Sequence, residues 1–226
     1  MNKIIERLHK QDLVWQGSAK VPTQQVSSTG FDELNQQLGG GFPKGIIEVQ
    51  SISGIGELRL LLPAIRQSVS EQRLAVFIDP YAKVCAQALA TQGFELDKIV
   101  IISPDKFKDC LWAAEQCLSS GACHSVVMWA ESPLEVHHIK RLKMASEVGN
   151  CQQFILRANK RESLTLPVDL SISLTPHIQG LSAQINKRKR GWPSNTFTIN
   201  MAELWPSLTL SSGSENVVNF PAQRVG

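Results

Sequence analysis

Long apolar runs are missing from this 226-residue chain. No stretch approaches the roughly 18 to 20 consecutive apolar residues that a membrane helix needs. The first sixteen residues carry five charged side chains, at Lys3, Glu6, Arg7, Lys10 and Asp12. Such a segment lacks the apolar centre of a secretion signal. We therefore expect a cytoplasmic protein with no membrane partner.

Paired cysteine motifs are also absent. The five cysteines are Cys85, Cys110, Cys117, Cys123 and Cys151, and no two of them form a CxxC pair. The five histidines are scattered, and none joins a cysteine at the spacing of a zinc site. The sequence therefore predicts reduced, buried thiols and no metal site.

Neither sign of charge dominates, since 23 Lys and Arg face 20 Asp and Glu for a formal net charge of +3. Such a small excess permits contact with nucleic acid but does not by itself argue for it. The length suits one domain with a sizeable core.

Short continuous apolar runs alternate with helical patterns over the first two thirds of the chain. The predicted strands are Ile46 to Val49, Leu74 to Ile78, Ile99 to Ile102 and Val126 to Trp129. Unbroken apolar runs of this length are typical of parallel strands that are buried on both faces. Helices are predicted over Glu57 to Ser70 and Ala82 to Thr91, and two more follow Ser103 and Ser132, with Gly149 ending the last. The pattern predicts an α/β fold with a doubly wound, mostly parallel sheet flanked by helices.

The rhythm changes after a further strand at Gln152 to Leu156. Short strands at Leu170 to Leu174, Leu181 to Ile185 and Phe197 to Ile199 indicate an antiparallel extension at the C-terminal edge of the sheet. From Ser211 onward the chain is polar and lacks periodicity, which favours a flexible tail. We divide the chain into an N-terminal extension (1–28), one domain (29–210) and the tail (211–226).

A glycine-rich turn, a strand, a tight loop and a helix follow one another between Thr29 and Leu62. This order builds a phosphate-binding loop, in which backbone N–H groups at a helix N-terminus face an anion. The residues TGFDEL and GGG before the strand resemble the RecA/RadA recombinase superfamily. The resemblance implies a RecA-like domain whose loop has the pattern GxxxxGK[ST].

The residues that bind nucleotide in that pattern are replaced here. Its glycines fall at Ser51 and Gly56, with Gly54 between them, its lysine at Glu57 and its hydroxyl at Leu58. A lysine would contact the β- and γ-phosphates and a hydroxyl would bind Mg²⁺. A carboxylate about 4 Å from a phosphate charge instead costs roughly 1 kcal/mol in water and roughly 4 at an effective dielectric constant near 20. At the end of the strand Val126 to Trp129, an aspartate that would hold Mg²⁺ is also missing.

We therefore expect no enzymatic activity, no cofactor and a degenerate loop kept for its structure. Glu57 then stabilises the first turn of its helix, where a carboxylate is favoured by the helix dipole. The alternative is an active ATPase in which a displaced lysine, such as Lys44, replaces the missing one.

Three further stretches resemble a narrower family. They are Gly54 to Ile65, Leu111 to Cys123 and Arg141 to Gly149, and they are similar to the ImuA proteins of bacterial mutagenic DNA repair, which are grouped with SulA. The resemblance implies a non-catalytic adaptor of the SOS response in translesion DNA synthesis, with an ImuB-like polymerase homologue and RecA as partners. A SulA-like division inhibitor that binds FtsZ is the alternative.

A basic run near the C-terminus is the candidate contact surface. It consists of Lys187, Arg188, Lys189 and Arg190, with Trp192 close behind. These residues suit an acidic partner protein, or a weak contact with the phosphate backbone of DNA. Adjacent residues of a strand point to opposite faces, so the run is equally compatible with a solvated strand end. In the tail, Phe220 belongs to a short apolar segment that suits docking onto a partner. Trp112, Trp129 and Trp205 are interpreted as packing residues.

Overall fold

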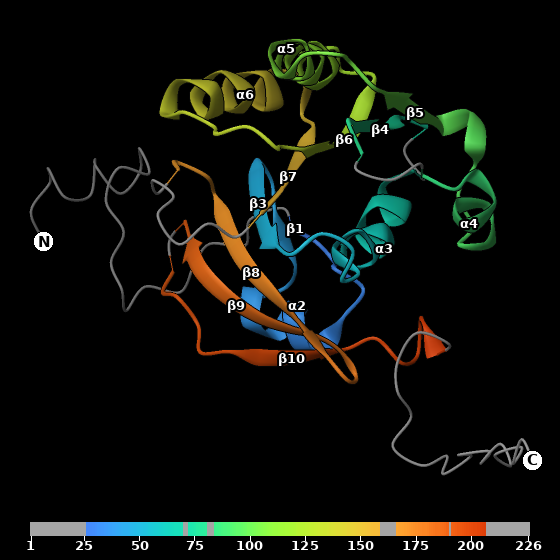
Figure 1. Ribbon diagram of the computed structural model, residues 1–226, viewed down its shortest axis with the longest axis vertical. Helices are drawn as coiled ribbons and strands as arrows, with labels where there is room; N and C mark the ends of the chain where they lie inside the picture. Colours follow the sequence, from blue (N-terminus) through green and yellow to red (C-terminus); the bar gives the residue numbers. More distant parts are fainter. Residues whose placement is uncertain (1–25, 70–71, 81–83, 159–165, 190, 207–226) are drawn as a thin grey trace, which may run out of the picture.

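The computed structural model describes residues 26–69, 72–80, 84–158, 166–189 and 191–206. Within these ranges eight strands form one sheet in the order β10-β9-β8-β3-β7-β6-β4-β5 (Figure 1). Their bounds are β3 (Ile46–Ser51), β4 (Leu74–Ile78), β5 (Ile99–Ile102), β6 (Cys123–Trp129), β7 (Gln152–Ala158), β8 (Leu170–His177), β9 (Gly180–Arg188) and β10 (Phe197–Asn200). The strands from β8 to β5 in that order pair in parallel, whereas β9 and β10 are antiparallel to their neighbours. The predicted fold class, with its antiparallel C-terminal edge, is confirmed.

Helices cover both faces of this sheet (Figure 1). They are α2 (Asp32–Leu38), α3 (Glu57–Val69), α4 (Ala86–Thr91), α5 (Phe107–Ser119) and α6 (Val136–Gly149), with a short 3₁₀ turn at Leu96–Lys98. A separate pair of strands, β1 (Val26–Ser27) and β2 (Phe42–Pro43), frames α2. Among the helices that the structure describes, none combines the length and the apolar character that crossing a membrane requires.

Two apolar cores lie on opposite faces of the sheet. Buried side chains of α2 and α3, such as Leu34 and Leu61, pack on one face against Phe77 and Phe154. On the other face α5 and α6 pack against β4, β6 and β7 around Met128. Strands β4, β6 and β7 are largely buried on both sides, which explains why the sequence shows unbroken apolar runs there.

The starts of three helices were predicted wrongly, and one of them is α4, which begins at Ala86 and not at Ala82. Helix α5 begins at Phe107 after Lys106, and not at Ser103, and α6 begins at Val136 after Glu135, and not at Ser132. Before α6 the chain stays extended, so that Leu134 enters the same core as Ile139 on the first turn. This placement is that of a hydrophobic staple, and His138 Nδ1 accepts the backbone N–H of Glu135 at 3.1 Å. Burial of Leu134 therefore outweighs the capping preference of Ser132.

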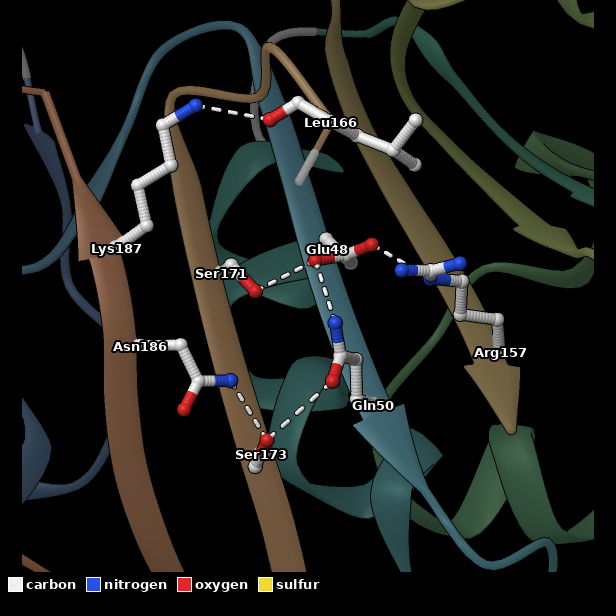
Figure 2. A network of polar contacts seen from close by, with 8 residues as sticks. All are labelled: Glu48, Gln50, Arg157, Leu166, Ser171, Ser173, Asn186 and Lys187. Atoms are coloured by element: carbon white, nitrogen blue, oxygen red, sulfur yellow. Dashed lines mark hydrogen bonds and ion pairs between the residues drawn. The ribbon is translucent and has the colours of Figure 1, made fainter. Parts of the chain in front are cut away.

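Helices α5 and α6 cover one face of β4, β6 and β7. On the same face of the sheet, the neighbouring strands β3, β8 and β9 carry polar side chains. Figure 2 shows Glu48 and Gln50 of β3, Arg157 of β7, and Ser171 and Ser173 of β8 on this face. Glu48 Oε1 lies 2.5 Å from Arg157 Nε, and Glu48 Oε2 accepts hydrogen bonds from Ser171 (2.5 Å) and Gln50 (2.9 Å). A charged residue inside an apolar strand is the sequence signal for this pair, which our sequence interpretation did not use.

The domain boundaries stay predictions. Strand β1 lies at the end of the proposed N-terminal extension (1–28), where it pairs with β2. Residues 1–25 of that extension and the whole proposed tail, 211–226, lie outside the described residues.

Candidate functional site

The loop between β3 and α3 lies at the C-terminal end of a central parallel strand. Gly54 (φ 86°) and Gly56 (φ 105°) adopt the left-handed backbone conformation that other residues avoid. The chain therefore turns tightly from Ser51 into the first turn of α3. Ligands of open α/β sheets bind at this end of the strands.

The carboxylate of Glu57 occupies the anion-binding position of this loop. Its Oε1 accepts the backbone N–H of Gly54 at 3.0 Å, and its Oε2 accepts that of Gly56 at 3.1 Å. Glu57 is the first residue of α3 and only 7% exposed. Backbone N–H groups at a helix N-terminus are the donors that hold phosphate in such loops. Here a side chain of the same loop satisfies two of them.

The positions that would bind Mg²⁺ carry apolar side chains. Leu58 packs against the core below the loop, and Trp129 and Ala130 are buried at the end of β6. Glu131 is exposed just beyond, and β6 keeps regular pairing with β7 as far as Trp129 and Leu156. Within the described ranges, no three or more His, Cys, Asp or Glu side chains are grouped to hold a metal ion.

A cavity of about 300 Å³ opens beside the loop. Its walls are largely apolar, with Leu62, Leu89, Trp129 and Trp205 among the lining residues. The Arg59 guanidinium carbon lies 5.7 Å from the centre of the Trp205 ring, a cation–π distance. An apolar cavity whose polar end carries a carboxylate suits an apolar or cationic group better than a triphosphate. The sequence interpretation missed Arg59 as part of this site, because only the fold brings it onto Trp205.

Lys44 lies at the opposite end of β3 from the loop. Its Nζ donates a hydrogen bond to Asn150 Oδ1 at 2.7 Å, next to the end of α6. The six residues of β3 separate it from the loop by roughly 20 Å, at about 3.3 Å per residue. Lys44 therefore lies too far from the loop to take the place of the missing lysine, whereas the absence of enzymatic activity stays a prediction.

The three described residues of the basic run do not form one surface. Lys187 Nζ donates to the carbonyl of Leu166 and Arg188 Nη1 to that of Gln37, each at 2.8 Å. Lys189 instead lines a second cavity at the far edge of the sheet. Trp192 is 67% exposed, and Arg190 and Phe220 lie outside the described residues. The three described residues of the run thus lie in different surroundings, and their role in binding stays a prediction.

The tryptophans differ in their surroundings. Trp129 is buried and Trp205 is half-buried against the core, as expected of packing residues. Trp112 is 62% exposed on the outer face of α5, so its assignment as a packing residue was wrong. In the sequence Trp112 is flanked by Leu111 and Ala113, so the apolar pattern alone did not show that its side chain faces away from the core.

Comparison with known proteins points to one family. The family model of the RecA N-terminal domain matches residues 1–154. The "Cell division inhibitor SulA" of Photorhabdus laumondii subsp. laumondii is 34% identical over 99 residues, which cover 44% of this chain and 55% of that protein. The RecA protein of Bacteroides thetaiotaomicron is 32% identical over 130 residues, which cover 57% of this chain and 39% of that protein. The matched regions thus span about half or less of these relatives.

Among solved structures, the crystal structure of SulA from Pseudomonas aeruginosa matches with a TM-score of 0.42 and 29% identity. The match covers 50% of this chain and 98% of that one.

Proposed function

The chain belongs to the RecA N-terminal domain family, and from that premise we propose that it is a cytoplasmic, non-catalytic protein of the SOS DNA-damage response. It acts through contacts with other proteins and binds no nucleotide at its loop. The observation that carries this proposal is the Glu57 carboxylate on the N–H groups of Gly54 and Gly56. A phosphate that entered the loop would have to displace the Glu57 carboxylate from these N–H groups, and it would then lie beside the negative charge of that carboxylate.

Titration with MgATP by calorimetry tests the loss of nucleotide binding. The protein should give no saturable heat at concentrations where an authentic RecA gives a clear isotherm. Tight, magnesium-dependent binding that is centred on the loop would overturn the proposal. A crystal grown with a nucleotide analogue locates any nucleotide that does bind.

More narrowly, we propose an ImuA-like adaptor in translesion DNA synthesis, with an ImuB-like polymerase homologue and RecA as partners. The resemblance of Gly54 to Ile65, Leu111 to Cys123 and Arg141 to Gly149 supports it. The apolar cavity beside the loop gives such a protein a place to receive a partner side chain. Purified protein should co-elute with one of the two partners in gel filtration, and absence of both complexes at low salt would count against the adaptor.

A SulA-like division inhibitor is the second candidate, and the 34% identity to a protein of that name favours it. In this case FtsZ is the partner. High expression in growing cells should then block septum formation and produce filaments, whereas the adaptor leaves cell length normal. Filaments together with direct FtsZ binding would replace the adaptor proposal.

A further inference from the structure

A second cavity, of about 340 Å³, lies at the opposite edge of the sheet from the degenerate loop. It is formed where β3 and β7 begin and where α6 ends, because Gly45, Gln152 and Asn150 line it. Six charged residues also line it, namely Lys44, Arg73, Lys143, Lys189, Glu147 and Asp169. Four cations against two carboxylates leave a formal excess of two positive charges.

Two of the cations are held in place by the fold. Lys143 Nζ lies 2.5 Å from Asp169 Oδ1, and Asp169 Oδ2 accepts the backbone N–H of Ile46 at 3.0 Å. Arg73 donates to the carbonyls of Asn150 (3.1 Å) and Gly149 (2.5 Å), and so binds the C-terminal end of α6. The negative charge of Asp169 is thus balanced by the ammonium group of Lys143. The Arg73 guanidinium donates hydrogen bonds to backbone carbonyl groups.

The other two cations face the cavity without a carboxylate partner. The ammonium of Lys44 binds a neutral amide oxygen, Asn150 Oδ1. Lys189 is exposed, and its side chain makes no ion pair with any residue in the part of the chain that the structure describes. Glu147, exposed on the last turn of α6, is the remaining negative charge. A concave surface with excess charge of one sign concentrates its field on a counter-ion.

We propose that this cavity binds a phosphate group, with the ammonium groups of Lys44 and Lys189 as its principal contacts. A lysine ammonium is a mobile point charge with three donors and is well suited to phosphate oxygens. The Arg73 guanidinium adds long-range attraction, and Ser27 lines the same cavity with a hydroxyl. Lys189, which does not share a surface with Lys187 and Arg188, would thus bind phosphate in this cavity. The proposal is independent of the degenerate loop and of the partners proposed above.

Fluorescence anisotropy of a labelled oligothymidylate tests a nucleic-acid source of the phosphate, and calorimetry with pyrophosphate tests a small-molecule source. Lys44→Gln and Lys189→Gln should each weaken binding about fivefold, the size of one contact between unit charges in water at about 4 Å. For the oligonucleotide, each substitution should also lower the slope of log K against log salt by about 0.7. Glu147→Gln removes a like charge and should tighten binding by a similar factor.

Lys140→Gln is the matched control, because Lys140 is an exposed cation of α6 that does not line the cavity. Thermal unfolding of each variant shows whether its fold is intact. If pyrophosphate binds and the oligonucleotide does not, the site takes small phosphates and the proposal stands. It fails if neither ligand binds, if Lys140→Gln weakens binding as much as the two cavity variants do, or if Glu147→Gln leaves the affinity unchanged.

Discussion

Glu57 shows how one substitution alters the chemistry of a loop while keeping its shape. A phosphate-binding loop leaves backbone N–H groups unsatisfied until its ligand arrives. Here the Glu57 carboxylate accepts the N–H groups of Gly54 and Gly56. The loop is therefore ordered without a nucleotide.

Replacing Glu57 with alanine should destabilise the fold by about 1–2 kcal/mol, because two N–H groups at a helix start lose their acceptor. Urea unfolding followed by circular dichroism measures the change. Glu131→Ala, which removes an exposed carboxylate nearby, should alter stability by less than about 0.5 kcal/mol. Equal effects of the two substitutions would mean that the Glu57 contacts contribute nothing.

The cysteines should differ sharply in reactivity. Cys85 is exposed, whereas Cys110, Cys123 and Cys151 are buried. Burial raises the pKa of the Cys110 thiol to about 11, with the nearby Asp79 carboxylate adding to it, and burial raises that of Cys151 to about 12. Both groups therefore stay protonated and unreactive at pH 8, since only the thiolate attacks.

A hydrogen bond between Cys117 and Cys123 raises the pKa of the Cys117 thiol and lowers that of Cys123, but Cys123 is buried and out of reach of a reagent. Titration of the native protein with an aromatic disulfide at pH 8 should therefore show one fast thiol, which Cys85→Ser removes. Denaturant should expose all five cysteines to the reagent. Rapid reaction of two or more thiols in native Cys85→Ser would show that the buried sites open readily.

At the scale of single residues, the sequence alone predicted the replacement of the lysine by Glu57 and its stabilising place in the first turn of α3. The hydrogen bond to Gly54 could not be predicted, because it depends on the loop's path. The cationic cavity was missed for a similar reason. Lys44, Arg73 and Lys189 are far apart in the chain, and only the folded sheet brings them to one cavity.

At the scale of elements, strands were predicted more accurately than helix starts. The runs Leu74 to Ile78 and Ile99 to Ile102 match β4 and β5 to the residue, because each strand is an unbroken apolar run in the sequence. A capping residue stabilises only one end of a helix, and burial of a nearby apolar side chain can contribute more free energy. Ser132 is followed directly by Pro133, a sequence that favours a helix start. Leu134 is nevertheless buried in the core, and α6 begins only at Val136.

The close contact between α5 and α6 depends on Gly149. A Cβ atom there would lie 1.9 Å from the carbonyl oxygen of Leu118, at the end of α5. Gly149→Ala should therefore cost about 2 kcal/mol from overpacking, even after the roughly 1 kcal/mol that alanine returns in helix propensity.

Thermal or chemical unfolding measures this loss. Lys140→Ala, at an exposed position on the same helix, is the control and should have little effect. A stabilised Gly149→Ala variant would show that the two helices separate at little cost.

At the scale of the molecule, the Glu48–Arg157 ion pair joins β3 to β7 in the middle of the sheet. The side chain of Glu48 is 4% exposed and that of Arg157 13%. Arg157→Leu leaves a buried carboxylate without its cation, which typically costs about 3–5 kcal/mol. The expected loss here is near the lower end, because Ser171 and Gln50 still donate to Glu48.

The double variant Glu48→Gln with Arg157→Leu removes both charges and should be more stable than Arg157→Leu alone. Chemical unfolding of the two variants, with each single substitution, completes a double-mutant cycle. Additive losses would mean that the two side chains do not interact.

Strand β3 has a hollow at each of its ends, one apolar and one cationic. The six residues between them span roughly 20 Å, about the width of a DNA double helix. Occupants of the two hollows would neither touch nor compete. With a ligand in each hollow, the protein would hold two different molecules at a fixed separation, without any conformational change.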